Sequence, residues 1–347
     1  MHRRAVEFSM IQARANPRRG LARRDVVVIG VLLGIAVLLL FPWILHQRTI
    51  ARRNQCDLRQ QNLAKANLLY EQSESRFPGY RNLQAVDRDG RRRAGSWVFS
   101  TLAYLDFDEK TNAAPYEELR KEYGPLGGDE TRGRPPQEFI AALVCPENMP
   151  TGGKRTPGWL SYVASCGLPD VEPQGDFPPD WPANGIFLDR FREPVRDAFP
   201  YEVTLEYLLA HDDGRDGDDR TQDSFTLLIS ENVDSGLWTD TTEARIGFVW
   251  TPYRAAPHEP RVERILNINE RRGQGDGAIE FARPSSNHGG GVNVAYASGA
   301  TAFLNESIDP VVLARAMAAD DAGIAWPGTD ESIGEPYRRG AVPGAGG

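Results

Sequence analysis

VVVIGVLLGIAVLLLFPWIL, the sequence of Val26–Leu45, contains no charged residue. A helix of about 20 such apolar residues spans the roughly 30 Å hydrocarbon core of a bilayer. Each Leu, Ile, Val or Phe near its centre favours insertion by about 0.3–0.6 kcal/mol, whereas a soluble core helix of this length usually has a polar face. The sequence therefore predicts one transmembrane helix, with the lipid bilayer as a partner.

The residues on either side of this helix indicate its orientation. Arginines from Arg14 to Arg24 precede the apolar run, and arginines from Arg48 to Arg59 follow it. Because both flanks are basic, the positive-inside rule gives only a modest preference for a cytoplasmic N-terminus. The rest of the chain is polar and has no second apolar run, so we expect a single-pass protein whose main domain is extracytoplasmic.

A short leader precedes the apolar run. Gly20 follows Arg18 and Arg19, and the segment Leu21–Asp25 separates it from the run. A secretory signal peptide has its small-residue cleavage site after the apolar region instead. The leader resembles that of bacterial type IV prepilins and type II secretion pseudopilins. The resemblance implies a prepilin peptidase that cuts after Gly20, other pseudopilin subunits as partners, and a place in the inner membrane.

Two positions depart from the prepilin pattern. Asp25 stands where the family usually has Glu, and Arg23-Arg24 replace residues that are normally uncharged. In pilins the acid pairs with a neighbouring subunit's free amine, because a carboxylate at the membrane edge is costly unless it is paired. The alternative is an uncleaved signal anchor with a basic flank.

The membrane helix is expected to continue into solvent. Gln47–Gln72 contains good helix formers and neither Gly nor Pro, and it places Leu63, Ala66 and Tyr70 on one face. Arg76–Gly79 contains a proline that ends the helix. We therefore divide the chain into a cytoplasmic leader, a transmembrane and amphipathic helix, an extracytoplasmic α+β domain and a Gly- and Pro-rich disordered tail, with the ranges 1–20, 21–80, 81–326 and 327–347.

A series of short motifs follows the membrane helix in order along the chain: Arg52–Cys56, Asn62–Ala64, Arg76–Gly79, Ser96–Val98, Leu102–Asp106, Cys145-Pro146, Ser161–Val163, Asn184–Phe187, Leu227–Asn232 and Arg283–Gly290. This ordered series resembles a bacterial pseudopilin-like family, domain of unknown function 1559, which is also classed as solute-binding-like. Only the order of the motifs makes the match specific. The family signature near its C-terminus is H-x9-D-G; here His288 is followed at that spacing by Ser298-Gly299, so Ser298 departs from it.

The domain after the helix alternates short β-rich runs with Pro/Gly breaks, which predicts an α+β fold with an antiparallel sheet packed against the long helix, as in pilins. Val292–Ala297 and Ala300–Asn305 predict a β-hairpin around the two-residue turn Ser298-Gly299. Such a turn places Tyr296 opposite Thr301 and Val294 opposite Phe303. The other strand candidates are Phe225–Ile229, Ile246–Trp250 and Arg261–Ile268, and Tyr201–Leu209 is either strand or helix.

Candidate ligands are few. The five histidines show no paired metal-ligand spacing, so we expect His288 to anchor the loop before the hairpin and predict no metal site there. The loop at 212–223 concentrates carboxylates, which calcium favours, although its spacing fits no EF-hand. We therefore expect no cofactor and keep calcium as the only candidate ion, with the ligands Asp212, Asp213, Asp216, Asp218 and Asp219.

The three cysteines are too few for a disulfide framework. Cys145 and Cys166 both lie in the domain that we expect to be exported, where a disulfide persists, so we predict that they are bonded and that Cys56 is left over. Two separate thiols are the alternative.

Composition and motifs narrow the function. A net charge of −8 argues against a nucleic-acid partner, and the sequence contains no Walker loop, complete GxGxxG, GxSxG or HExxH motif, so we expect no enzyme. Two classes remain. One is a pseudopilin-like structural subunit of a type II secretion or type IV pilus-like system; the other is a membrane-tethered extracytoplasmic protein that binds a solute, glycan or protein.

Overall fold

A computed structural model of the protein shows a mixed α+β fold with one long N-terminal helix. The chain divides into two compact units, residues 1–50 and residues 51–347. The leader before Arg23, the acidic loop at 212–219 and the tail after residue 320 lie outside the described residues. The residues described are 23–86, 90, 92–105, 139–149, 156–167, 185–191, 202–210, 222–250, 252–253, 264–265, 267–270, 272–273 and 279–320.

Helix α1 (Arg23–Glu74) carries the apolar run. Pro42 lies inside α1 without ending it, as the sequence predicts, and the described side chains of Val26–Leu45 are almost all exposed. In length and composition this segment suits a membrane anchor or a signal sequence. Helix α1 contains all of the described residues of the first unit, from Arg23 to Ile50.

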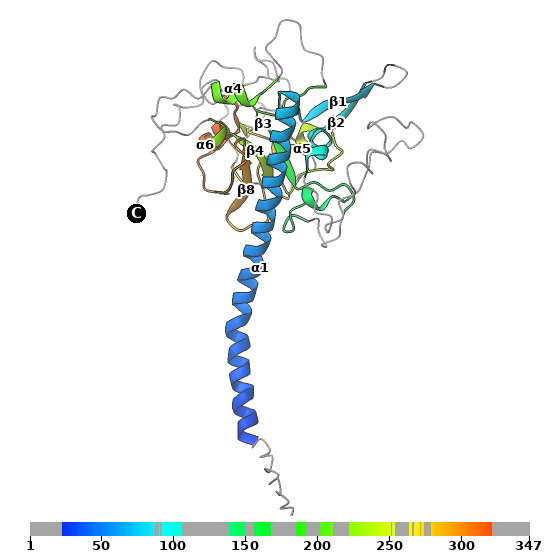
Figure 1. The fold of residues 1–347 in the computed structure, drawn as a ribbon. Coiled ribbons are helices and arrows are strands. Elements are labelled where there is room, and N and C mark those ends of the chain that lie inside the picture. The colour runs from blue at the N-terminus through cyan, green and yellow to red at the C-terminus, as the bar shows by residue number, and fades with distance from the viewer. Residues whose placement is uncertain are drawn as a thin grey trace, which may run out of the picture. The chain divides into compact units, whose positions relative to one another are not determined.

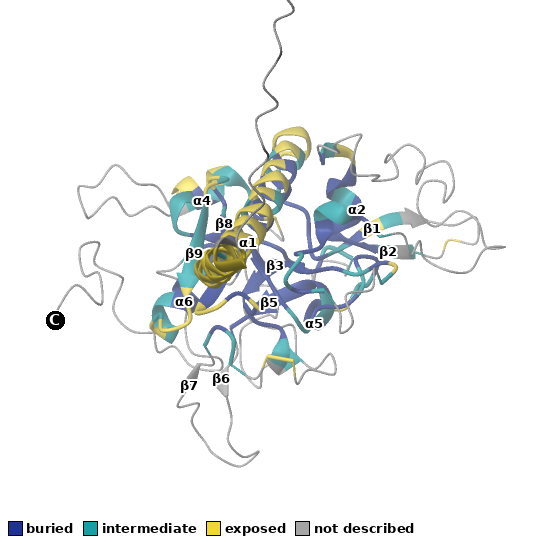
Figure 2. Ribbon diagram, turned by 90° about the horizontal axis from the view of Figure 1, so that it is seen from below, coloured by how far each residue is buried: buried dark blue, intermediate teal, exposed yellow. Residues whose placement is uncertain are grey.

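The second unit is built on one five-stranded sheet with the strand order β5-β3-β4-β8-β9; β3, β4 and β8 are labelled in Figure 1. The strands in chain order are β3 (Tyr162–Gly167), β4 (Leu227–Glu231), β5 (Gly247–Val249), β8 (Gly291–Tyr296) and β9 (Thr301–Asn305). Every residue of β3, β4 and β5 is buried, and so is most of β8 (Figure 2). These strands read as continuous apolar or small-residue runs because both of their faces are covered.

The sheet is mixed rather than antiparallel, which corrects the prediction. Strand β5 runs parallel to β3, whereas the other neighbouring strands are antiparallel. Because Glu231 at the end of β4 pairs with Tyr162 at the start of β3, the following segment crosses β3 at that same end. β5 therefore begins at the same end of the sheet as β3 and runs parallel to it. Apolar patterning specifies burial but not strand direction.

Smaller elements surround this sheet. β1 (Arg81–Val86) pairs with β2 (Arg92–Ser96), which leads into α2 (Trp97–Thr101), and the indole of Trp97 donates to the carbonyl of Ile246 at 3.0 Å. Asp309 caps α6 (Pro310–Met317) by accepting from Val311 and Val312. The remaining elements are η1 (Leu102–Tyr104), η3 (Ala141–Leu143), α4 (Leu205–Ala210), η4 (Gln222–Ser224), α5 (Glu243–Ile246), β6 (Pro252–Tyr253), β7 (Arg264–Ile265) and η5 (Ile279–Phe281).

The C-terminal part of α1 packs on the domain along one face. The predicted residues Leu63 and Ala66 are fully buried, and Tyr70 is half-buried. Cys56 and Gln60 extend the same face by two turns, since their spacing from Leu63 is helical. The amide of Gln60 donates to the carbonyl of Asn293 in β8 at 2.8 Å, so the helix is joined to the sheet by a buried hydrogen bond as well as by apolar contact.

The hairpin at β8 and β9 is present, but its register differs by one residue from the prediction. Ala295 pairs with Thr301, and Phe303 lies opposite Asn293. The N–H of Tyr296 donates to the carbonyl of Ala300, so the turn between this pair has three residues, 297–299, instead of two. Gly299 adopts a positive φ of 83° in this turn, and its N–H donates to the carbonyl of Tyr296. Three-residue loops with a left-handed residue are a common hairpin type.

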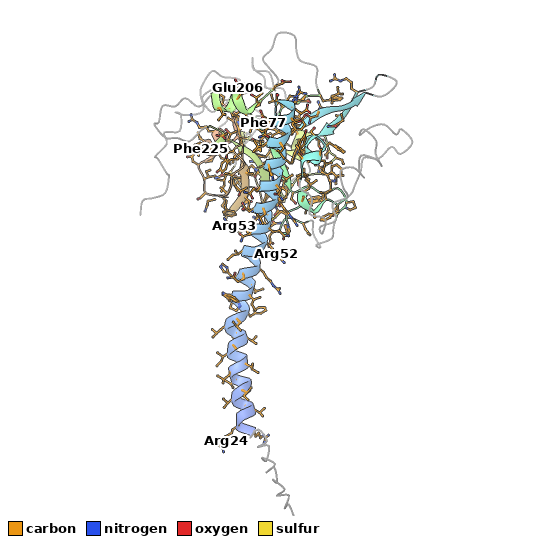
Figure 3. All side chains as sticks on the ribbon, in the orientation of Figure 1. Arg24, Arg52, Arg53, Phe77, Glu206 and Phe225 are labelled. Carbon is orange, nitrogen blue, oxygen red and sulfur yellow. A yellow bond between two sulfur atoms is a disulfide. The ribbon has the colours of Figure 1, made fainter. Side chains whose placement is uncertain are left out.

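Phe303 is only half-buried, because β9 is an edge strand of the sheet. The guanidinium of Arg53 lies 3.5 Å from the centre of its ring, from the part of α1 labelled in Figure 3. This contact is a cation–π interaction.

Candidate functional site

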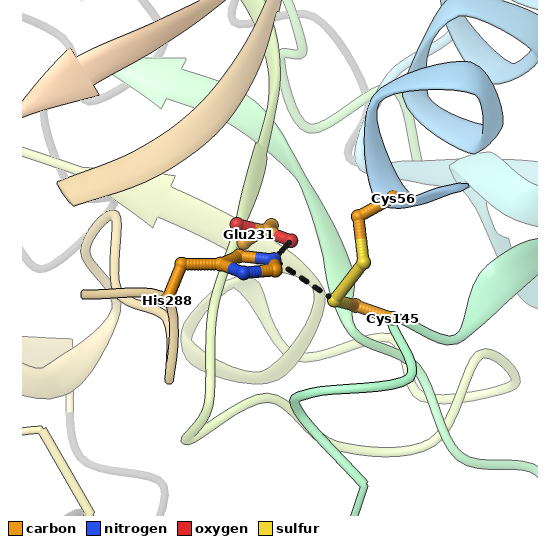
Figure 4. A group of neighbouring side chains, drawn as sticks. All are labelled: Cys56, Cys145, Glu231 and His288. Atoms are coloured by element: carbon orange, nitrogen blue, oxygen red, sulfur yellow. Dashed lines mark hydrogen bonds and ion pairs between the residues drawn. A yellow bond between two sulfur atoms is a disulfide. The ribbon is translucent and has the colours of Figure 1, made fainter. Parts of the chain in front are cut away.

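Four side chains from four separate segments meet in the interior of the second unit (Figure 4). Cys56 comes from α1, Cys145 from the loop after η3, Glu231 from the end of β4 and His288 from the loop before β8. The first three are fully buried and His288 is 3% exposed. We call these four residues the CCEH cluster.

Cys56 and Cys145 form a disulfide with a Cα–Cα distance of 5.2 Å, which lies within the usual range for such bonds. The predicted Cys145–Cys166 bond is therefore wrong. Cys166 lies in β3, is buried, and directs its thiol at the carbonyl of Ala164. The signal that could have identified the true pair is the helical spacing of Cys56 from Leu63, which places Cys56 on the domain-facing side of α1.

His288 contacts both the disulfide and the glutamate. Its Nε2 lies 3.4 Å from the Sγ of Cys145 and 3.2 Å from Oε1 of Glu231. Ser286 holds the backbone of this loop: its hydroxyl accepts from the N–H of His288 at 3.0 Å and donates to the carbonyl of Gly291 at 2.7 Å. The predicted loop-anchoring role thus falls to Ser286, while the imidazole faces the other three members of the cluster.

The carboxylate of Glu231 is held by β8. The backbone N–H of Asn293 donates to its Oε2 at 3.0 Å, and the Asn293 amide lies 3.4–3.5 Å from both oxygens. Burying a carboxylate is costly unless it is hydrogen-bonded, and Asn293 and His288 supply close polar contacts to it. Because Gln60 bonds to the carbonyl of Asn293, one hydrogen-bonded chain joins α1, β8 and β4.

Tyr162 and Arg59 close the side of the cluster next to α1. The hydroxyl of Tyr162 donates to the carbonyl of Cys56 at 3.4 Å, and the guanidinium of Arg59 donates to the carbonyl of Val144. Complete burial, aided by the negative charge of Glu231, raises the pKa of Tyr162 well above its usual 10.0. The phenol therefore stays neutral and serves as a donor.

The other candidate residues from the sequence are not part of this cluster. Ser298 and Gly299 form the β8–β9 turn, at the opposite end of β8 from His288. Asp25 lies in α1. Gly20 and Leu21 fall outside the described residues, as do the five candidate calcium ligands between Asp212 and Asp219.

The cluster unites motifs that the sequence showed only as an ordered series. Each of its four members lies in one of the family-like blocks, and His288 alone had been singled out as a possible ligand. Their spacing along the chain has no local pattern, because each comes from a different element. One donor atom from each side chain lies within 4.8 Å of the other three. Two cysteine sulfurs, an imidazole and a carboxylate this close together are suited to redox or metal chemistry.

Comparison with known protein families gives one match. Residues 46–311 match the model of a protein family of unknown function, DUF1559. The matched region includes all four residues of the CCEH cluster and the last part of α1. No curated protein and no solved structure matches the chain.

Proposed function

The chain belongs to the DUF1559 family, and we propose that it is a membrane-anchored, pseudopilin-like structural subunit of a type II secretion or type IV pilus-like system. The observation that carries the proposal is the continuity of α1. A single helix, Arg23–Glu74, contains an exposed apolar segment long enough to span a bilayer and a C-terminal segment that packs on an α+β domain.

The leader supports the same function. Gly20 and Leu21 stand before the apolar run, where a prepilin-type cleavage would leave the whole of α1 on the mature protein. The exposed side chains of Val26–Leu45 then need a lipid or protein partner, and helices of neighbouring subunits supply one in a pilus-like assembly.

The disulfide supports an extracytoplasmic domain. Bonds such as Cys56–Cys145 persist in oxidising compartments and are rare where thiols are kept reduced. Cys56 follows the last apolar residue of the run, Leu45, by 11 positions. The domain is thus oxidised close to the membrane, on the side opposite the basic leader.

Processing of the N-terminus tests the proposal. The full chain is produced in cells with and without an active prepilin peptidase, and the mass of the membrane-bound protein is measured. We expect Met1–Gly20 to be absent only when the peptidase is active, and Gly20→Val to prevent cleavage. Gly30→Val, at an open position inside the anchor, is the control and should be processed normally.

Two outcomes contradict the proposal. A mature protein that begins at Met1 in the presence of the peptidase favours the alternative, a tethered binding protein with an uncleaved signal anchor. A protein that loses its leader but does not associate with other copies of itself in the membrane also contradicts the role of a structural subunit. Association is measured by cross-linking through Leu38→Cys in the exposed apolar segment, which should yield dimers and larger species in wild-type membranes.

A further inference from the structure

We propose that the reduced protein binds Zn²⁺ through the CCEH cluster, with the thiolates of Cys56 and Cys145, the imidazole of His288 and the carboxylate of Glu231 as its four ligands. The disulfide and the metal are alternative states of one site. This inference rests on the described geometry and holds whether or not the protein is a pilus-like subunit.

The distances within the cluster fit a tetrahedral zinc site. With Zn–S bonds of about 2.3 Å and Zn–N or Zn–O bonds of about 2.0–2.2 Å, neighbouring ligand atoms lie roughly 3.3–3.8 Å apart. The Cys145 Sγ–His288 Nε2 distance is 3.4 Å, and the His288 Nε2–Glu231 Oε1 distance is 3.2 Å. The four donor atoms all lie within 4.8 Å of one another, and the two sulfur atoms must separate for the metal to enter, because a covalent bond joins them in the oxidised state.

Charge and burial also point to a cation. A disulfide is neutral and needs neither a carboxylate nor an imidazole beside it, yet Glu231 and His288 are placed there at the cost of burying both. With Zn²⁺ bound, two thiolates and one carboxylate leave a net charge of −1 around a neutral imidazole. The metal therefore offsets two of the three negative charges that its own ligands carry.

The surroundings of the ligands resemble the outer shell of a metal site. Asn293 holds the carboxylate of Glu231 from its far side, and Ser286 fixes the loop that carries His288. Such partners orient the ligands before the metal arrives. Four side chains from four elements also make the site closed, as structural zinc sites are.

The donor set selects among metals. Calcium and magnesium prefer oxygen ligands in larger number, whereas two thiolates with one imidazole suit zinc or another soft transition metal. Zinc accepts thiolate, imidazole and carboxylate ligands in one four-coordinate site, which matches this set of two sulfurs, one nitrogen and one oxygen.

In the reduced protein Cys56 and Cys145 are both thiols, and Zn²⁺ binding releases one proton from each as the two Zn–S bonds form. Thiol–disulfide exchange with an oxidised disulfide instead transfers the two electrons and two protons to that disulfide, which becomes a dithiol, and forms the Cys56–Cys145 bond. Starting from the oxidised protein, a trialkylphosphine with one water regenerates the two thiols and becomes a phosphine oxide. Either state joins Cys56 of α1 to the domain.

The test is a metal titration of the full chain in detergent. The protein is reduced under anaerobic conditions with a trialkylphosphine, freed of reductant and titrated with Co²⁺ and then Zn²⁺. We expect one Co²⁺ per chain with the visible absorption of a tetrahedral thiolate site, its loss when Zn²⁺ displaces the cobalt, and a higher melting temperature with zinc. The oxidised protein should bind neither metal at this site.

Matched variants locate the metal. Cys145→Ser and His288→Asn should each weaken Zn²⁺ binding by more than about 100-fold, which exceeds the effect typical of losing an outer partner. Cys166→Ser, which removes a buried thiol outside the cluster, should bind zinc as the wild type does. A reduced wild-type protein that binds no stoichiometric metal, folded or not, overturns the proposal. So does binding that survives in Cys145→Ser or disappears in Cys166→Ser.

Discussion

Glu231 connects more of the structure than any other member of the CCEH cluster. It ends β4, pairs in register with Tyr162 of β3, and its carboxylate contacts Asn293 of β8 and the imidazole of His288. A fully buried acid of this kind is retained only where its partners are fixed. Through these contacts Glu231 joins β3, β4 and β8 to the loop that carries His288, next to the disulfide.

Tyr162 gives this interior a measurable pH dependence. Its raised pKa means that the folded state keeps the phenolic proton at pH values where the unfolded chain loses it. The folded state thus binds more protons above pH 10, so the free energy of unfolding is unaffected below that pH and falls as pH rises beyond it.

We expect Tyr162→Phe to reduce this alkaline loss of stability. At neutral pH the variant should be less stable by about 1 kcal/mol, because one buried hydrogen bond is removed. Above pH 10 its free energy of unfolding should fall less steeply than that of the wild type. Denaturant unfolding between about pH 8 and 11 measures both quantities, and identical slopes for the two proteins contradict the assignment.

At the scale of elements, α1 has two different environments along one helix. Its apolar run is exposed, whereas from Cys56 onwards one face is buried against the domain. Leucines five positions apart report on this face: Leu63 is fully buried, and Leu58 is 58% exposed.

Leu63→Ala should destabilise the domain by about 2–5 kcal/mol, since it removes buried methyl groups and leaves a cavity. Leu58→Ala makes the same chemical change on the exposed face and should alter stability by no more than about 0.5 kcal/mol. Both are measured by chemical denaturation of the full chain in detergent. Equal effects of the two variants would show that α1 does not pack on the domain through this face.

The elements also show which features can be read from sequence. The extent of α1 and the presence of the β8–β9 hairpin agree with the patterns of apolar residues, because burial follows side-chain period. The sequence predicts a strand at Phe225–Ile229, and β4 lies two residues later, at Leu227–Glu231. The hairpin register differed because Gly299 takes a left-handed conformation in a three-residue turn, and Ser298-Gly299 alone does not distinguish the two loop lengths. The direction of β5 depends on a connection that has no sequence signature.

The CCEH cluster could be predicted only in part, because it too depends on contacts between elements that have no sequence signature. Cys145 and His288 each lie in a short motif, but their approach depends on how β4, β8 and α1 pack together. Cys166 was the nearer choice of partner for Cys145 in sequence, whereas the bond reaches across 89 positions to Cys56. Pairing over such a separation follows from the fold and not from residue spacing.

At the scale of the whole molecule, the account links the anchor, the compartment and the cluster. The apolar run precedes the domain, and a disulfide such as Cys56–Cys145 persists in oxidising compartments, which is the environment that the proposed extracytoplasmic location would provide. The negative charge of the chain, −8 overall, argues against nucleic acid as a partner. The state of the three cysteines in cells therefore reports on topology and on the cluster together.

The most direct measurement is a cysteine map of the full chain taken from its native membranes. Thiols are blocked with a maleimide at lysis, the protein is denatured and alkylated with a second reagent, and peptides are identified without reduction. The account predicts a Cys56–Cys145 cross-linked peptide and Cys166 labelled only by the second reagent, because its thiol is buried. A Cys145–Cys166 cross-link contradicts the described fold, and three unbonded thiols in a protein that carries no zinc contradict an extracytoplasmic domain.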